Sequence, residues 1–458
     1  MSRGRSVLVF CALVSPLACG GGAPALNAAA SPADAWLNRA RASYKTLDLD
    51  DAIESARSAV KAAPENTEAH TLLARIALAR LDFGETLRAL EGVAGTDAHT
   101  LRARAYWYLH DTEHAADELD AELSDAAVRD GWAREVVKLA RKGHGRKPFT
   151  HEGASVAILD MPEAGPLDVV PIDIDGEPGL ALVATGIGEL TVDAATRKEP
   201  AWVTVGFGPA ARVKDVPALT QDLSALSKQL GAPIKALLGV HFLRQLHVTF
   251  DRRGGQFVVR TSDPSAPPDS TKLAASYERG GGMAVRLGLG APSDAPCAFR
   301  VDSSAPYPIG LTDAGWAKAG IPLASLEPEP QLGAAFKRGV IPMVRAGSFE
   351  LPKIPGIGGG DIATITATEP IDLCGVMGAG FMQAFRVTMT DGGRALWLEA
   401  DPTMGMVAGA LPQPQAPPAP AAAPATAPAT APATKPPALP QTSPKPAAKA
   451  TPAPRAKP

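Results

Sequence analysis

Two distant segments of this 458-residue chain repeat one another, and this repetition limits the possible folds more than any other feature. Residues 237–250 (LLGVHFLRQLHVTF) and 376–389 (VMGAGFMQAFRVTM) align without a gap. The identical pairs are Gly239/Gly378, Phe242/Phe381, Val248/Val387 and Thr249/Thr388. Upstream, residues 180–193 and 297–310 share an order of strand, turn and strand. We therefore expect a duplicated β-rich lobe, over 150–262 and 275–401.

Short runs rich in β-branched residues, bounded by Gly, Pro and Asp, support strands in both lobes. In the first lobe a tight turn at Asp175-Gly176 joins two such runs. The runs expected to be strands are 169–174, 180–183, 203–205, 236–239, 248–250 and 256–259. The second region continues in the same style from Met283 to about Ala400.

A helical pattern with a period of about 34 residues precedes the lobes, over 33–142. Small residues allow paired helices to approach closely, and Pro64 ends the second helix. The repeat resembles the tetratricopeptide repeat at Trp36, Ala40, Tyr44, Asp48, Ala52, Ala59 and Pro64. Further copies begin at Thr67 and near Thr96, and 126–142 is expected to form a capping helix. The resemblance implies a surface that binds a protein or peptide; an unrelated helical hairpin bundle is the alternative.

Each β-rich lobe resembles a lobe of the retropepsin-like aspartic proteases, which occur singly in retroviral enzymes and in tandem in pepsins. The family pattern is a strand ending in Asp-Thr/Ser-Gly, a flap region, a hydrophobic-hydrophobic-Gly strand, a short helix and a closing strand. The matching segments are 237–239, 242–243, 248–251, 376–378 and 381–382. The fold class implied for the whole chain is a helical-hairpin repeat solenoid followed by a two-lobed, mostly β retropepsin-like domain.

The catalytic positions that the resemblance implies are incomplete. Two carboxylates that share one proton are required, since like charges about 3 Å apart cannot both ionise. In the first lobe Ala184 takes the aspartate position, followed by an intact Thr-Gly. The second lobe keeps Asp302 but has Ser304 in place of the turn glycine. We expect a catalytically degenerate domain in which Asp302 is a polar residue bonded to backbone amides.

The alternative is an active aspartic endopeptidase that uses Asp302. It requires a second acid, either Asp302 of another chain or an acid such as Asp193 or Glu189. No other catalytic motif is recognisable: His241 and His247 lack the close pairing of a metal site, so neither a metal nor another cofactor is expected.

The N-terminus has the pattern of an export signal, predicted over 1–18. Arg3 and Arg5 precede an apolar run, and Leu17-Ala18-Cys19-Gly20 resembles a bacterial lipobox. This implies lipidation of Cys19, a flexible tether over 19–32, and anchoring to the outer membrane of the cell envelope. A conventional signal cut near residues 23–30 is the alternative.

Two of the four cysteines, Cys297 and Cys374, then remain in an oxidising compartment. The strands that hold them run close together in the resembled fold, which implies a disulfide within the second lobe; two buried free thiols are the alternative. Finally, 411–458 holds 16 Pro and 16 Ala and is expected to be a disordered tail. The net charge of −3 argues against a nucleic-acid partner.

Overall fold

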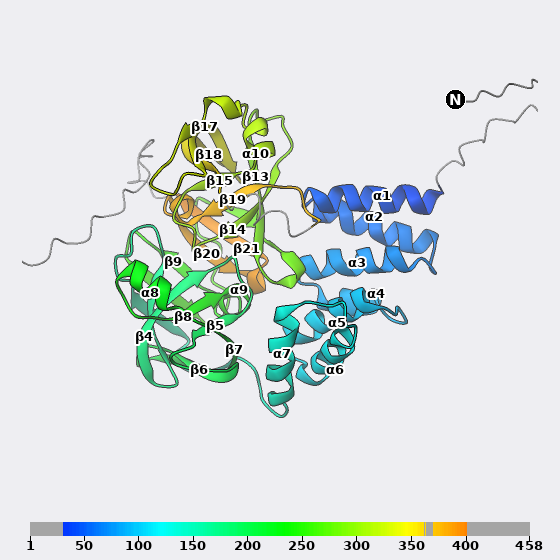
Figure 1. Cartoon of the computed structure of the whole chain (residues 1–458), viewed down its shortest axis with the longest axis horizontal. Coiled ribbons are helices and arrows are strands. Elements are labelled where there is room, and N and C mark those ends of the chain that lie inside the picture. The colour runs from blue at the N-terminus through cyan, green and yellow to red at the C-terminus, as the bar shows by residue number, and fades with distance from the viewer. Residues whose placement is uncertain (1–30, 361, 363–369, 401–458) are drawn as a thin grey trace, which may run out of the picture. The chain divides into compact units, whose positions relative to one another are not determined.

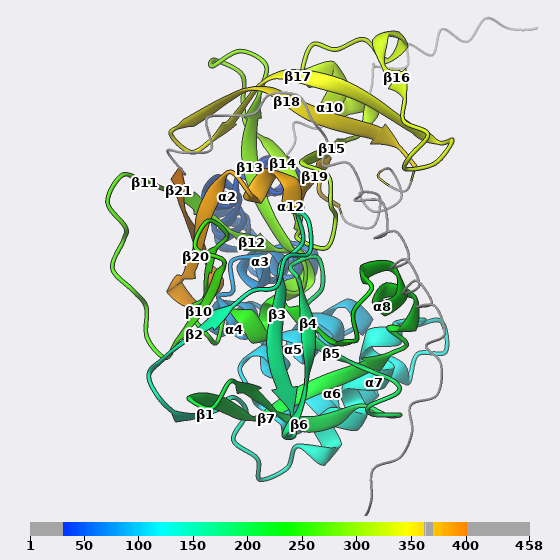
Figure 2. The same ribbon diagram turned by 90° about the vertical axis from the view of Figure 1, so that its left-hand side faces the viewer.

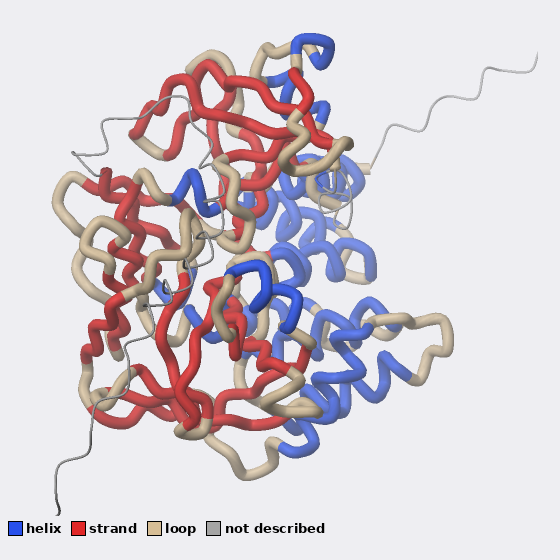
Figure 3. The backbone as a smooth tube through the Cα atoms, turned by 60° about the vertical axis from the view of Figure 1, so that its left-hand side comes forward, coloured by secondary structure: helices blue, strands red, loops and turns tan. Residues whose placement is uncertain are grey.

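The computed structural model describes residues 31–360, 362 and 370–400. Helices make up the first part of the chain, and strands dominate from Thr150 onward (Figures 1 and 3). This order confirms the predicted fold class of a helical region followed by a mostly β domain. Within the described residues, no helix has the length and apolar character needed to cross a membrane. Cys19, the signal over 1–18, most of the tether over 19–32 and the tail over 411–458 lie outside the described residues.

Seven helices form successive hairpins that pack side by side (Figure 1). Buried alanines, such as Ala40, Ala52 and Ala74, line the contacts between these helices and allow them to approach closely. The helices are α1 (Pro32–Lys45), α2 (Leu49–Ala62), α3 (Thr67–Ala79), α4 (Phe83–Ala89), α5 (Thr96–Tyr108), α6 (Thr112–Leu123) and α7 (Gly131–Lys142).

The same turn recurs at the end of α1, α3 and α5, which makes the repeat visible in the backbone. Leu47, Leu81 and His110 each adopt a positive φ, between 56° and 68°. The amide of the aspartate that follows (Asp48, Asp82 and Asp111) donates to a carbonyl five residues earlier, at 2.8–2.9 Å. The three helical hairpins are therefore built on one template. Helix α7 begins five residues later than the predicted capping helix, because Asp130 caps it by accepting from the amide of Ala133.

The first lobe is a seven-stranded sheet of order β1-β7-β5-β8-β4-β3-β6, closed by pairing of β6 with β7. The tight turn expected at Asp175-Gly176 joins β3 to β4, with both residues at positive φ. The strands are β1 (Thr150–Gly153), β3 (Val169–Ile174), β4 (Glu177–Ala184), β5 (Leu190–Asp193), β6 (Ala201–Phe207), β7 (Ala211–Gln221) and β8 (Ile234–Gly239). Helices α8 (Ser224–Leu230) and α9 (Val240–Leu243) flank β8.

The second lobe repeats this strand order. Its eight-stranded sheet has the order β12-β13-β14-β19-β15-β18-β17-β16, closed by pairing of β13 with β17 (Figure 2). The strands are β12 (Ser276–Tyr277), β13 (Met283–Leu289), β14 (Cys297–Asp302), β15 (Ile309–Leu311), β16 (Glu327–Pro328), β17 (Phe336–Ala346), β18 (Phe349–Gly359) and β19 (Leu373–Gly378). Helices α10 (Asp313–Lys318) and α12 (Ala379–Met382) follow β15 and β19. In both lobes the motif strand lies parallel to the hydrophobic-Gly strand, as β4 to β8 and β14 to β19.

A third, six-stranded sheet joins the lobes in the order β11-β21-β20-β9-β10-β2. Its centre is the contact between β9 and β20, where Thr249 and Thr388 are direct partners with hydroxyl oxygens 3.0 Å apart. These two threonines are one of the identical pairs of the sequence repeat. The strands are β2 (Val156–Asp160), β9 (Thr249–Asp251), β10 (Gln256–Arg260), β11 (Ser270–Ala274), β20 (Phe385–Thr390) and β21 (Ala395–Ala400).

Strand β11 lies before residue 275, where the second lobe was expected to begin. It pairs with β21 at one edge of the six-stranded sheet, and β2 holds the equivalent place at the other edge. No strand was expected at 270–274, because only Thr271 and Leu273 of this edge strand are buried.

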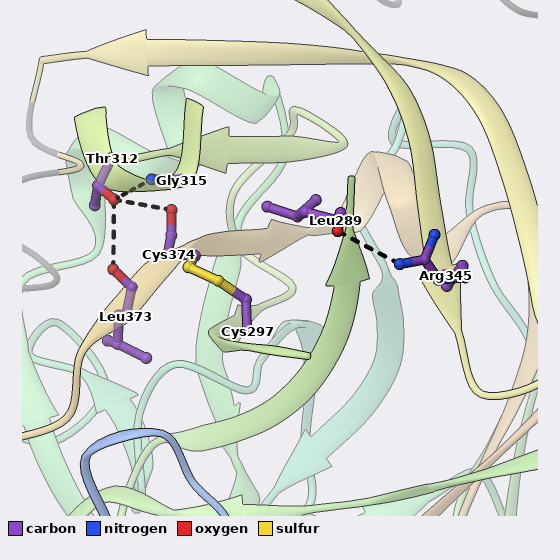
Figure 4. Close-up of a disulfide and its surroundings, with 7 residues drawn as sticks. All are labelled: Leu289, Cys297, Thr312, Gly315, Arg345, Leu373 and Cys374. Atoms are coloured by element: carbon purple, nitrogen blue, oxygen red, sulfur yellow. Dashed lines mark hydrogen bonds between the residues drawn. A yellow bond between two sulfur atoms is a disulfide. The ribbon is translucent and has the colours of Figure 1, made fainter. Parts of the chain in front are cut away.

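Cys297 and Cys374 form a disulfide between the parallel strands β14 and β19 (Figure 4). Their Cα atoms are 5.9 Å apart, and the bond closes a loop over 77 positions of sequence. Both side chains are buried, at 3% and 6% exposure. The bond links the motif strand of the second lobe to the strand beside it.

We predict that replacing both cysteines by alanine lowers the free energy of unfolding by about 4 kcal/mol, because the loop is no longer closed in the unfolded chain. Chemical denaturation of the double variant and of the wild type measures this difference. Equal stabilities, or two reactive thiols in the unfolded and unreduced wild type, would contradict the pairing.

Candidate active site

The two motif turns are tied to each other by a symmetric set of four hydrogen bonds. The hydroxyl of Thr185 donates to the carbonyl of Val301 at 3.0 Å and accepts from the amide of Ser303 at 3.0 Å. The hydroxyl of Ser303 donates to the carbonyl of Val183 at 2.7 Å and accepts from the amide of Thr185 at 3.1 Å. Both side chains are buried. The polar residues after Ala184 and Asp302 thus hold the centre of the domain together.

Ala184 and Asp302 occupy equivalent places on their strands. Ala184 is in register with Gly239, and Asp302 is in register with Gly378. Neither glycine has space for a side chain: a Cβ atom would lie 2.2 Å from the carbonyl oxygen of Glu189 at Gly239, and 2.0 Å from that of Tyr307 at Gly378. The repeated glycines therefore allow the chain that follows each motif to cross close to the neighbouring strand.

Asp302 is held by its own turn and lies against the first lobe. One carboxylate oxygen accepts from the amide of Ser304 at 2.9 Å and from its hydroxyl at 2.5 Å. A Cβ atom at Gly186 would lie 2.9 Å from the carboxyl carbon of Asp302, so this glycine gives the carboxylate its space. In the duplicated fold, Gly186 of the first lobe is equivalent to Ser304 of the second, and Ala184 is equivalent to Asp302.

The tip of the hairpin in the flap region of each lobe is held by a hydrogen bond. In the first lobe, the carbonyl of Ala210 at the tip of β6–β7 accepts from the amide of Ala154, next to edge strand β2. In the second lobe, the amide of Ser348 at the tip of β17–β18 donates to the hydroxyl of Thr271 on edge strand β11. The first bond continues the pairing of β1 with β7, and the second ties the tip of β17–β18 to the six-stranded sheet.

The two acids considered as partners of Asp302 are engaged elsewhere. Asp193 ends β5, and its carboxylate accepts from the amide of Leu223 at 3.0 Å. Glu189 is 4% exposed and faces the helical hairpins. The Glu189 Oε1 atom accepts from three aromatic donors: Trp132 Nε1 at 2.9 Å, Trp107 Nε1 at 3.3 Å and the hydroxyl of Tyr108 at 3.4 Å. Its role is to join the helices to the first lobe.

Other buried polar groups surround this contact. The guanidinium of Arg244 lies over the rings of Phe83 and Tyr108, at 5.2 and 5.0 Å, and donates to His241 Nδ1 at 2.7 Å. Burial raises the pKa of Glu189, despite the Trp132 hydrogen bond. Burial, together with Arg244, lowers the pKa of His241 and lowers that of His110 to about 4. In the sequence, the only sign of this cluster was the run of aromatic residues in the third helical repeat, which includes Trp107 and Tyr108.

His241 and His247 each have other neighbours and do not lie together as metal ligands would. His241 is buried in the cluster just described, and His247 Nδ1 lies 2.5 Å from the carboxylate of Asp263. Among the residues that the structure describes, no group of three or more His, Cys, Asp or Glu side chains could hold a metal ion.

Comparison with known proteins gives likeness in structure alone. No protein-family model matches the chain, and no curated protein matches it in sequence. A retropepsin-like aspartic protease from Rickettsia conorii is 18% identical, with a TM-score of 0.21, over 28% of this chain and 88% of that one. An aspartic proteinase from Irpex lacteus is 11% identical, with a TM-score of 0.37, over 56% of this chain and all of that one. The solved structures that the mostly β part of this chain resembles in fold are thus aspartic proteases.

We predict that His110 makes the docking of the helices sensitive to acid. The unfolded chain protonates His110 near pH 6.5, whereas the folded protein does so near pH 4, so stability present above pH 6.5 is lost as the pH falls toward 4. Leucine occupies the same turn position at Leu47 and Leu81, which makes His110→Leu a matched variant. It should lose less stability across this window, by up to about 3 kcal/mol.

Denaturation curves at several pH values between 7 and 4 measure this difference. The raised pKa of Glu189 opposes the histidine effect, but it does so in both proteins and does not alter the comparison. Parallel losses of stability in the wild type and His110→Leu would contradict the assignment.

Proposed function

We propose that this protein is a cell-envelope lipoprotein whose aspartic-protease-like domain is catalytically degenerate and binds a polypeptide or acts as a scaffold. The single observation that supports this most strongly is Ala184, which holds the position equivalent to Asp302 beside motif turns that Thr185 and Ser303 still link. Alanine supplies no proton acceptor or donor. One aspartate cannot act as general base and general acid in the same step.

The surroundings of Asp302 agree with this proposal. Its carboxylate is bonded to Ser304 of its own turn, and Glu189 and Asp193 have other partners. The first lobe thus offers no carboxylate at position 184, and the acids considered as its replacement are engaged elsewhere.

We further propose that Ala184 and Ser304 are coupled departures from the family pattern. Gly186 has no side chain because the carboxylate of Asp302 fills that space. Because the two lobes are equivalent, a carboxylate at position 184 would fill the space that a side chain at position 304 occupies. The loss of the first carboxylate therefore leaves room for the side chain of Ser304.

The helical hairpins are proposed to be tetratricopeptide-like repeats that contact a protein or peptide. Part of their surface already contacts the β domain, because Trp107, Tyr108 and Trp132 donate hydrogen bonds to Glu189. Lipidation of Cys19 would place the whole assembly at the outer membrane, facing other envelope proteins.

We predict that the purified mature protein does not cleave polypeptides between pH 3 and 7. Ala184→Asp alone should also be inactive, because Ser304 obstructs the added carboxylate. The double variant with Ser304→Gly restores both carboxylate and space, and pepstatin-sensitive cleavage of unfolded casein is the measurement.

The matched control is the double variant with Asp302→Asn added, which should abolish any activity gained. Pepstatin-sensitive cleavage by the wild type that is lost in Asp302→Asn would overturn the proposal in favour of an active aspartic endopeptidase. In that case the second acid would have to come from another chain or from a residue other than those considered above.

We also predict that Cys19→Ala releases the protein from membranes. Metabolic labelling with palmitate should mark the wild type and leave the variant unlabelled. Unlabelled wild type, or unchanged membrane fractionation of Cys19→Ala, would contradict lipid anchoring through Cys19.

A further inference from the structure

We propose that a cavity between the helical turns and the second lobe binds an extended polypeptide, which adds a strand to the free edge of β11. This proposal rests on the polypeptide-binding function above and gives it a site distinct from the region around Asp302. The cavity has a volume of about 1020 Å³, at the upper end of the range of roughly 300–1,000 Å³ for ligand pockets.

Three walls form the cavity. The first consists of two of the repeated helical turns, Leu47–Asp50 and Arg80–Gly84. The second is the chain segment Lys272–Ser276, which includes most of β11. The third comes from β13 and β17, through Gly288 and Arg345. The cavity thus lies where an edge of the six-stranded sheet and the sheet of the second lobe diverge beside the helices.

The edge of β11 exposes backbone groups to this cavity. The amide of Ala275 donates to the carbonyl of Arg394 at 3.0 Å, so Ala275 points toward β21. Since the backbone alternates along a strand, Lys272 and Ala274 point their amides and carbonyls away from β21. In the described part of the chain, no strand pairs with β11 on that side. Such an edge is a ready partner for another extended backbone.

The charges around the cavity favour a peptide over a highly charged ligand. Acidic and basic side chains line it in equal number. Several of them neutralise each other, as Arg286 with Asp48 at 3.2 Å and Arg394 with Asp391 at 2.7 Å. Lys272 is exposed on β11 and has no ion-pair partner within the described residues. We therefore expect the bound strand to carry a carboxylate near Lys272 and otherwise small or apolar side chains.

The opposite edge of the same sheet supplies a matched control. In β2, the amide of Met161 donates to the carbonyl of Gly255, so Ile158 points its backbone amide away from β10 as Ala274 does from β21. Proline at either position removes an outward amide and leaves the ladder bonds intact. Only Ala274 lies on the cavity.

The test uses the mature full chain and a library of random decapeptides displayed on phage. Peptides selected on the wild type should bind Ala274→Pro at least about tenfold more weakly and bind Ile158→Pro unchanged. Lys272→Glu should weaken the peptides that carry an acidic residue at a fixed position. Bound peptide should also slow hydrogen exchange at the amides of Lys272 and Ala274, a readout that stands even if Ala274→Pro does not fold.

Two failures are distinguishable. Selected peptides that bind Ala274→Pro and Lys272→Glu as tightly as the wild type, without protecting the β11 amides, would overturn this site and leave polypeptide binding in place. The absence of any selected peptide would overturn the site and the polypeptide-binding function together.

Discussion

The reciprocal hydrogen bonds between Thr185 and Ser303 are the interaction on which the β domain depends. They bring two motif turns, 118 residues apart in sequence, into one buried contact at the axis between the lobes. The duplicated strands pair on either side of this contact, and Thr249 meets Thr388 at the centre of the six-stranded sheet. Because the second motif residues make these bonds, the lobes stay joined whether or not both carboxylates are present. None of these bonds uses the side chain at position 184 or the carboxylate of Asp302.

The helical region is not an independent appendage of this domain. Glu189 is buried with one oxygen bonded to three aromatic donors from α5 and α7, and its other oxygen has no partner within the described residues. A buried carboxylate of this kind is stable only while its donors remain in place. The helices and the first lobe consequently form a continuous packed unit, and the helical turns also form one wall of the cavity beside β11.

Much of this architecture could be predicted because it depends on local and repeated patterns. The pair Gly239 and Gly378 was recognisable in the sequence, and the structure explains it: each glycine admits a crossing chain that no side chain would permit. Asp48 was likewise recognisable in the repeat pattern, and the structure places Asp82 and Asp111 at the same turn of the later hairpins. Strand β11 escaped prediction because only alternate residues of an edge strand are buried, and Glu189 escaped because its partners lie more than 50 residues away. Contacts of this kind depend on packing between elements, which a single sequence does not encode locally.

The central claim is that Ala184 and Ser304 are matched to each other, so that the frame of a two-carboxylate site remains without its chemistry. A double-mutant cycle of unfolding free energies for Ala184→Asp, Ser304→Gly and the pair tests it most directly. We expect Ala184→Asp alone to destabilise the protein by about 1–3 kcal/mol, as overpacking does, and Ser304→Gly to recover most of that loss. Additive effects within about 0.5 kcal/mol would show that the two positions do not share space and would contradict the account.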